Sequence, residues 1–291
     1  MDELTALQAG LITAEGMKRG LALELRPDDA VISPYAKCGT TWLQQIVHTL
    51  RTGGDMEFDD ISRVVPWMET SSDLGLDLAA EQVATPRAFK SHLPWDAVPK
   101  GGRYIVSLRD PGDALVSAFR FMEGWFLEPG AVPIADFARA RFLDRRGGHD
   151  YWSHLLSWWP RRHDANVLLL AYEDMKVDLP GTVRRVASFI GVPLDDELFD
   201  IVVDHASLDF MTRHKDRFDD LLMRERSEKV AGLPPGSDSA KVRSGQVGSH
   251  RVELPDDIQQ ELRQTWHTVV EPELGFDSYE SLLKALRAES A

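Results

Sequence analysis

The sequence predicts an α/β fold in which helices cover both faces of a central, mostly parallel sheet. Short apolar runs at residues 30–33, 103–110 and 166–171 are typical of buried strands. Amphipathic helical patterns separate these runs, and such alternation predicts parallel strands joined by helical crossovers. No internal repeat or linker divides the chain. We therefore expect one domain over residues 1–291, with peripheral helices at about residues 1–25 and 277–291.

Local patterns predict the elements in chain order. Strands are expected at residues 30–33, within 85–95, at 103–110 and at 166–171. Helices are expected near residues 4–12, 40–50, 113–122, 134–143, 151–159, 182–190, 195–203, 255–269 and 279–287. Residues 228–250 are rich in glycine, proline and serine and predict a long irregular loop, which in a compact domain is usually functional or disordered.

Composition restricts the function. Hydrophobic residues make up 43% of the 291 residues, which suffices for a sizeable core, and no apolar run is long enough for a membrane span. The acidic start of the chain lacks the pattern of a secretory signal, and a single cysteine cannot form an internal disulfide, so we expect a cytoplasmic protein. The net charge of −14 argues against nucleic acid as a partner. An anion site here would be a local basic pocket.

Residues 30–50 have the pattern of an anion-binding turn. A strand leads through a turn at residues 34–39 into a helix whose first amides lack carbonyl partners. Gly39 allows close approach of an anion, and Lys37, Thr40 and Thr41 add a charge and two hydroxyl donors. Because Lys37 precedes Gly39, the turn is not a Walker A loop. We expect a phosphate or sulfate ligand; the alternative is an ordinary strand–turn–helix unit with a chance lysine.

A second cationic position follows the strand at residues 103–110. Arg109 stands at the carboxyl edge, where open α/β sheets bind ligands, and Ser117 falls early in the next helix. Arginine suits bidentate recognition of phosphate. The alternative is a surface arginine paired with Asp110 or Asp113.

Two further segments carry candidate groups. Lys90 and His92 are two residues apart at a strand end, so their side chains can point the same way. Histidine is the natural general base near neutral pH, although most of the 9 histidines are expected to be structural or at the surface. In residues 241–250, basic residues accompany Gly245 and Gly248, which would let the backbone wrap an anion. A solvated flexible loop is the alternative.

Together these segments resemble the cytosolic PAPS-dependent sulfotransferase family, from about residue 30 to residue 269. (PAPS is 3′-phosphoadenosine 5′-phosphosulfate.) The family's 5′-phosphosulfate loop, YPKSGTTW, is similar to YAKCGTTW at residues 35–42. Its 3′-phosphate segment is similar to SLRDPGDALVSAF at residues 107–119, and its Phe-Lys-Thr/Ser-His-Leu-Pro stretch to FKSHLP at residues 89–94. Its Tyr-Glu-Asp-Met-Lys and Arg-Lys-Gly-x-x-Gly-Asp-Trp motifs resemble residues 170–194 and 242–250. The motifs keep the family's order and spacing, and we expect a bacterial member.

The resemblance implies a P-loop NTPase-like sulfotransferase fold with PAPS as co-substrate, 3′,5′-bisphosphate adenosine (PAP) as product, and no metal. Trp42 would stack on the adenine and Tyr172 would lie near it. The implied 5′-phosphosulfate contacts are Lys37, Cys38, Gly39, Thr40, Thr41 and Trp42. The implied 3′-phosphate contacts are Arg109, Ser117, Arg243, Ser244 and Gly245, and Ser207 matches a further cofactor contact.

Four departures from the family pattern, at five residues, concern affinity for the cofactor rather than the base. Cys38 stands where serine is usual, and Ser244 where lysine or arginine is common. Ala206 replaces the threonine before Ser207, and residues 249–250 are Ser-His instead of Asp-Trp. Cys38 also raises a second hypothesis: a thiol at a helix N-terminus beside a lysine should have a lowered pKa and be redox-sensitive. The alternative is a small residue in place of serine.

The resulting hypothesis assigns three roles. His92 takes the acceptor's proton, Lys37 neutralises the bridging oxygen of the leaving PAP, and Lys90 stabilises the transferring sulfuryl oxygens. The acceptor would be a small hydroxylated, hydrophobic molecule: an alcohol, phenol or lipid. The aromatic residues expected near it are Phe58, Trp67, Trp95, Phe121, Trp125 and Phe126.

Two other functions stay open. One is a P-loop-type kinase, which would need a Walker A loop and a magnesium-holding aspartate. The other is a non-catalytic nucleotide-binding protein, which would not need Lys90 or His92. Family members are often dimers, which leaves a homodimer open.

Overall fold

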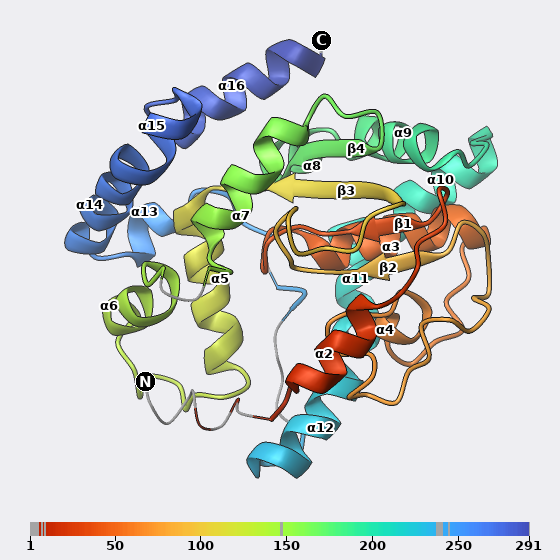
Figure 1. Ribbon diagram of the computed structural model, residues 1–291, viewed down its shortest axis with the longest axis horizontal. Helices are drawn as coiled ribbons and strands as arrows, with labels where there is room; N and C mark the ends of the chain where they lie inside the picture. Colours follow the sequence, from red (N-terminus) through yellow and green to blue (C-terminus); the bar gives the residue numbers. More distant parts are fainter. Residues whose placement is uncertain are drawn as a thin grey trace.

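The fold is organised by a four-stranded parallel sheet with the strand order β2-β1-β3-β4. The computed structural model describes residues 6, 8, 10–145, 148–236, 241–243 and 245–290. The strands are β1 (Ala30–Ile32), β2 (Ala88–Lys90), β3 (Arg103–Leu108) and β4 (Val167–Ala171). Every pairing between them is parallel, with Ile32 opposite both Lys90 and Ile105. The four expected strands and the expected fold class are thereby confirmed (Figure 1).

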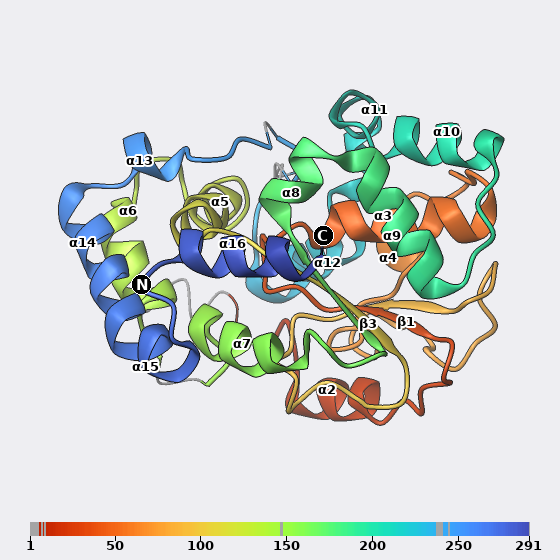
Figure 2. The ribbon, with the colours of Figure 1, turned by 90° about the horizontal axis from the view of Figure 1, so that it is seen from above.

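Helices cover both faces of this sheet. Along β1, Ala30 and Ile32 pack into one hydrophobic cluster and Val31 into another, because successive side chains of a strand point to opposite faces. All three residues are fully buried. Figure 2 shows α3 (Thr40–Thr52) and α9 (Leu179–Ile190) on one side of the sheet, and α2 (Ala14–Leu21) and α7 (Tyr151–Trp158) on the other. Burial on both faces explains why the strands are continuous apolar runs.

The remaining helices complete the layers and the rim. They are α4 (Ile61–Val64), α5 (Pro111–Glu123), α6 (Ile134–Phe137), α8 (Tyr172–Val177), α10 (Asp196–His205), α11 (Leu208–Arg213), α12 (Leu221–Ala231), α13 (His250–Glu253), α14 (Asp256–Thr265), α15 (Glu271–Leu274) and α16 (Tyr279–Ser290). Short π-helical turns at residues 138–142 and 266–270 continue α6 and α14, and a 3₁₀ turn at residues 159–161 follows α7. No helix among the described residues has both the length and the apolar character needed to cross a membrane.

Several helices differ from the expectation. The patterns did not predict α8, α11, α12, α13 or α15, and α12 overlaps the start of the segment expected to be irregular. The helix α2 lies within residues 1–25, where a peripheral helix was expected. The buried face of α12 consists only of Leu222, Met223 and Ser227, so it leaves almost no apolar periodicity in the sequence. The helix expected near residues 4–12 lies partly outside the described residues.

Three strands are followed by helices that begin at the same edge of the sheet, and this edge positions the site. The chain passes from β1 into α3, from β3 into α5 and from β4 directly into α8. Because the strands are parallel, these helix starts all lie at the carboxyl ends of the strands, where ligands bind in open α/β sheets.

Candidate active site

A cavity of about 540 Å³ lies where these strands end. The segments that follow all four strands contribute to its wall, joined by α5, α11 and the segment around residue 241. The expected site residues that line it are Lys37, Gly39, Thr40, Thr41, Trp42, Lys90, His92, Arg109, Ser117, Tyr172, Ser207, Arg243 and Gly245. Cys38 is not among them, and Ser244 lies outside the described residues.

The turn at residues 34–39 is held by one side chain from β3 and one from the residue that follows it. Ser107 Oγ donates to the Cys38 carbonyl at 2.5 Å, and Arg109 Nη1 donates to the Lys37 carbonyl at 2.8 Å. Lys37 and Gly39 both adopt left-handed backbone conformations, with φ of 68° and 98°. A Cβ at Gly39 would lie 3.0 Å from Tyr172 Cδ2, so glycine is required both for the conformation and for space.

The N-terminus of α3 presents free donors to the cavity. The amides of its first turn have no carbonyl partners within the helix, and no side chain caps them. The Thr40 side chain is buried, and its Oγ1 has no hydrogen-bond partner among the described residues. Unpaired buried donors at a helix start form an anion-binding arrangement.

Lys37 and Lys90 place two ammonium groups on the cavity wall. Lys37 Nζ lies 4.2 Å from the centre of the Phe121 ring, and Lys90 Nζ lies 4.2 Å from that of Trp67. Burial, with the neighbouring cation of Lys241, lowers the pKa of Lys37 to about 7. Burial lowers the pKa of Lys90 to about 8, although the carboxylate of Asp220 opposes this shift. An anionic ligand would favour the charged form of both lysines.

His92 is held as a neutral imidazole. Its Nδ1 lies 2.9 Å from the Pro34 carbonyl, which can only accept, so Nδ1 carries the proton and Nε2 keeps its lone pair. Its backbone amide donates to Glu69 Oε1 at 2.7 Å, and its ring packs edge-on against Trp67. Burial, together with the charge of Lys90, holds the pKa of His92 well below its usual value.

Four of the residues expected to contact the 3′-phosphate line a smaller pocket of about 60 Å³ beside the main cavity. They are Arg109, Ser117, Arg243 and Gly245. Arg109 is only 7% exposed and donates to the carbonyls of Lys37 and Gln246, and its guanidinium lies 4.3 Å from the centre of the Tyr172 ring. The structure therefore excludes the alternative, in which Arg109 is a surface residue paired with Asp110 or Asp113.

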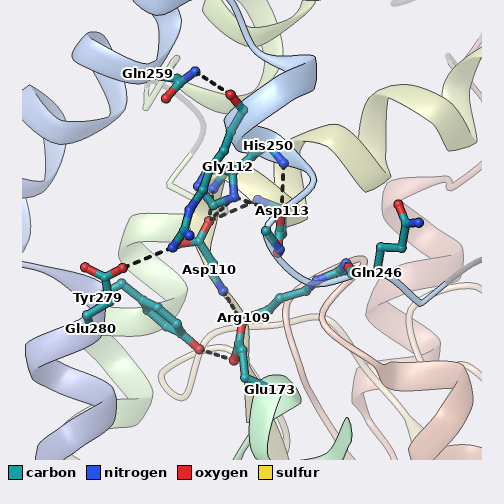
Figure 3. Close-up of polar contacts among 12 residues, drawn as sticks. Arg109, Asp110, Gly112, Asp113, Glu173, Gln246, His250, Gln259, Tyr279 and Glu280 are labelled. Atoms are coloured by element: carbon teal, nitrogen blue, oxygen red, sulfur yellow. Dashed lines mark hydrogen bonds and ion pairs between the residues drawn. The ribbon is translucent and has the colours of Figure 1, made fainter.

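The segment that carries Gly245 is anchored to α5 (Figure 3). Asp113 is 1% exposed and accepts from the amides of Gly248 and His250 and from His250 Nδ1 at 2.8 Å. Burial disfavours the charged imidazole, but the hydrogen bond to Asp113 and the charge of Asp110 outweigh it and raise the pKa of His250. The histidine of the Ser-His departure thus anchors this segment to α5.

The same three side chains form a cluster that the sequence did not reveal. One ligand atom each from Asp110, Asp113 and His250 lie within 4.8 Å of one another, the spacing of a metal site. These atoms already bond to one another and to backbone amides, since Asp110 Oδ1 also accepts from the Gly112 and Asp113 amides. The cluster is accounted for by these hydrogen bonds.

Comparison with known proteins decides the family. A family model described as "Sulfotransferase domain" matches residues 27–274. Sulfotransferase 1E1 of Bos taurus is 34% identical over 199 residues, which cover 65% of this chain and 67% of that protein. Sulfotransferase 1B1 of Canis lupus familiaris is 33% identical over 199 residues, covering 64% and 67%. The chain belongs to the sulfotransferase family. The expected family and enzyme class are confirmed.

Solved sulfotransferase-like structures share the fold. The complex of retinol dehydratase with retinol and PAP superposes with a TM-score of 0.69 at 22% identity, covering 93% of this chain and 94% of that one. Mouse sulfotransferase SULT7A1 complexed with PAP gives a TM-score of 0.69 at 20% identity, covering 95% of each chain.

The prediction for the Cys38 thiol in this sulfotransferase is wrong. The side chain is 1% exposed, and burial raises its pKa to about 12 in spite of the nearby Arg109 and Lys37. Its amide donates to the Tyr35 carbonyl, and its own carbonyl is bound by Ser107. The structure therefore gives no support to redox sensitivity or to a cofactor contact at this residue.

The apolar wall of the cavity agrees only in part with expectation. Neither Phe58 nor Trp95 lines the cavity. Phe58 packs against His48 and Phe218, and Trp95 packs against Tyr104 and Trp158. Of the aromatic residues expected near the acceptor, Trp67, Phe121, Trp125 and Phe126 do line the cavity, joined by Leu11, Ile12, Met122, Met211 and Met223.

Sequence reasoning also missed a buried ion pair on the wall. Asp220 and Lys241 both line the cavity and bond to each other, although they come from distant segments. Lys241 belongs to the basic segment singled out above, but no pattern indicated Asp220, which belongs to a pair of aspartates before α12. Only the folded chain brings the two together.

Proposed function

We propose that this sulfotransferase moves the sulfuryl group of PAPS to a hydroxyl of a small hydrophobic acceptor and releases PAP. One observation carries the proposal: the motifs converge on a single cavity that is cationic near β1 and β3 and apolar toward α5 and α12. Such a cavity has the size of small-molecule sites, which typically measure about 300–1,000 Å³.

The donor end would use the groups that the fold leaves free. The uncapped start of α3 and the Thr40 hydroxyl would hold the 5′-phosphosulfate, and the pocket at Arg109 and Ser117 would hold the 3′-phosphate. The Trp42 ring lies 5.7 Å from that of Tyr172 and is fixed by a 2.7 Å hydrogen bond from Nε1 to the Ala206 carbonyl. These rings would contact the adenine. The PAP bound in retinol dehydratase and in SULT7A1 supports this assignment.

The transfer itself would follow an in-line displacement at sulfur. The acceptor oxygen forms a bond to sulfur while the bond from sulfur to the bridging oxygen breaks, and PAP leaves with that electron pair. His92 Nε2 takes the acceptor's proton, and the Pro34 carbonyl stabilises the imidazolium that forms at Nδ1. Lys37 neutralises the bridging oxygen and Lys90 the sulfuryl oxygens. These cations supply the charge, so the proposal requires no metal.

The acceptor would occupy the apolar part of the cavity. Trp67 borders both Lys90 and His92, so an acceptor packed against its ring would place a hydroxyl beside the proposed base. Retinol and androsterone, bound in structures of retinol dehydratase, have this chemistry: an apolar body with one hydroxyl.

Thermal unfolding with PAP, compared with ATP plus magnesium, tests the donor. A ligand at 100 times its dissociation constant adds about 2.7 kcal/mol to the free energy of unfolding. We expect a clear rise in Tm with PAP alone. A rise only with ATP and magnesium would replace the proposal with a kinase.

Turnover of PAPS with a panel of hydroxylated apolar compounds then tests the transfer. His92→Ala should lower kcat by roughly 10²–10⁴-fold, the usual contribution of a general base, while PAP binding is retained. Equal loss of turnover and PAP binding would show that His92 is structural.

A further inference from the structure

The cavity wall holds one carboxylate among six cations, counting the described residues. The carboxylate is Asp220, and the cations are Lys37, Lys90, Arg109, Lys176, Lys241 and Arg243. Asp220 is only 4% exposed. Its Oδ1 lies 3.9 Å from Lys90 Nζ, and its Oδ2 forms an ion pair with Lys241. A cavity that is to receive an anionic donor thus contains a fixed negative charge of its own.

We propose that Asp220 is a positioning residue, the internal counterion that keeps Lys90 and its neighbours charged until the anionic donor arrives. This inference rests on the proposed function. A buried ammonium without a partner tends to lose its proton, and a neutral amine would neither attract the donor nor stabilise the sulfuryl oxygens.

The surroundings of the lysines identify Asp220 as the main opposing charge. Burial is the largest cause that lowers the pKa of Lys90, and Asp220 is the largest cause that raises it. Lys241 also lowers this pKa, whereas Asp60 and Glu69 raise it less than Asp220 does.

Lys37 has a similar environment. It faces the cations of Lys241, Arg109 and Lys90, and Asp220 opposes them. Both lysines therefore depend on the same carboxylate. The charges of Lys241, Lys90 and Lys37 keep Asp220 ionised by holding its pKa far below the usual range in spite of burial.

Two other acids near Lys90 have different tasks. Asp60 caps α4 and accepts from the Leu222 amide, and Glu69 accepts from Ser91 and from the His92 amide. Burial raises the pKa of both, and neither lines the cavity. They cannot replace Asp220 at the wall.

A counterion that serves the free enzyme has a distinct kinetic signature. Once the donor is bound, its phosphate and sulfuryl oxygens surround the same lysines and take over the role of Asp220. Removing Asp220 should therefore change the affinity for PAP and kcat/KM, which report the free enzyme, more than it changes kcat.

Asp220→Asn provides the test, because asparagine keeps the shape and tolerates the left-handed backbone at this position, where φ is 52°. Asp216→Asn is the matched control: it changes the net charge equally, but Asp216 lies exposed in the same stretch. The PAP dissociation constant is measured by titration calorimetry between about pH 6 and pH 9.

In the unaltered enzyme, PAP affinity should fall as the pH rises through the pKa values of Lys37, about 7, and Lys90, about 8. In Asp220→Asn this fall should begin at least about one pH unit lower, the smallest shift usual for an opposite charge at this distance. At pH values below this fall, Asp220→Asn should bind PAP at least as tightly as the unaltered enzyme does, because a carboxylate that repels the ligand is gone. The control should match the unaltered enzyme.

Two results would overturn the inference: an unchanged pH profile, or a loss of affinity by the same factor at every pH, which marks a merely structural role. Lys241→Gln should move the fall to higher pH, and the double variant should lie between the two single ones. This opposite shift keeps the inference testable even if Asp220→Asn folds poorly.

The proposed function and the counterion can fail separately. If the unaltered enzyme binds no PAP at any pH, the donor assignment is wrong. An NMR titration of ¹³C-labelled lysine side chains then still decides the counterion role. It should give Lys90 a lower pKa in Asp220→Asn than in the control, and equal values would refute the role.

Discussion

The helices α3 and α5 both begin at the carboxyl edge of the sheet, after the neighbouring strands β1 and β3, and only α3 has its first amides free of a side-chain cap. In α5 the side chain of Asp110 accepts from the amides of Gly112 and Asp113 at 2.8 and 3.1 Å, and Pro111 occupies the first turn. In α3 the capping position is Gly39, which offers no side chain. The comparison teaches that a helix N-terminus after a parallel strand keeps its amides available to an anion only where the capping residue offers no side-chain acceptor.

The most direct way to break this difference is to give α3 an acidic residue. Thr40→Asp would set a carboxylate among the amides proposed for the 5′-phosphosulfate. Two like charges 4 Å apart repel by about 4 kcal/mol at an effective permittivity of 20, so PAP affinity should fall by roughly three powers of ten. Calorimetric titration measures this. Thr40→Val removes only the unpaired hydroxyl, and an equal loss in both variants would contradict the electrostatic explanation.

Gly39→Ala tests the geometry of the uncapped start. The left-handed backbone costs a residue with a Cβ about 1–2 kcal/mol, and this Cβ would also press on Tyr172 at 3.0 Å. We expect a lower free energy of unfolding and weaker PAP binding. Gly53→Ala, at the other end of α3, has φ of 72° but nothing within 4 Å of the new Cβ. If both variants behave alike, the Tyr172 contact is unimportant.

Asp110→Ala removes the side-chain cap from the N-terminus of α5, a cap of the kind that α3 does not have. Loss of such a cap typically costs about 1 kcal/mol of stability, measurable by urea denaturation. Asp110→Asn keeps the accepting oxygen and should recover most of the loss. A rise in PAP affinity without a drop in stability would mean that the freed amides of α5 also serve as an anion site.

The smallest effect should come from the anchor between α5 and the Gly245 segment. The pKa of His250 is raised in the folded protein, so its stabilising contribution is complete below the unfolded pKa of about 6.5 and disappears as the pH rises through the folded pKa. The difference in the free energy of unfolding between the unaltered protein and His250→Gln should shrink over that range. A constant difference across pH would exclude a charged anchor.

The sequence predicted the sheet because burial on both faces leaves continuous apolar strands, as in Ala30–Ile32 and Val167–Ala171. It predicted most of the residues that line the cavity at the strand ends, because the turn and strand-end residues are local patterns. It could not predict contacts between distant segments, such as Asp220 with Lys241 or Asp113 with His250. The roles of His92, Lys37 and Lys90 stay predictions.

The error at Cys38 has the same origin. Local reasoning counted the helix start and the neighbouring lysine, both of which favour a thiolate. The fold buries the side chain almost completely, and desolvation outweighs both effects. Burial of a single side chain depends on the packing of the whole chain, and the sequence around residue 38 does not contain it.

Arg109 has a consequence for how ligands bind. Its guanidinium holds the carbonyls of Lys37 and Gln246 at once, so one rigid group joins the turn before α3 to the segment beside Gly245. Ordering either segment fixes the position of the other. The two phosphates of a nucleotide should therefore bind cooperatively. The binding free energy of a ligand that carries both phosphates should exceed the sum of the binding free energies of two ligands that carry one phosphate each.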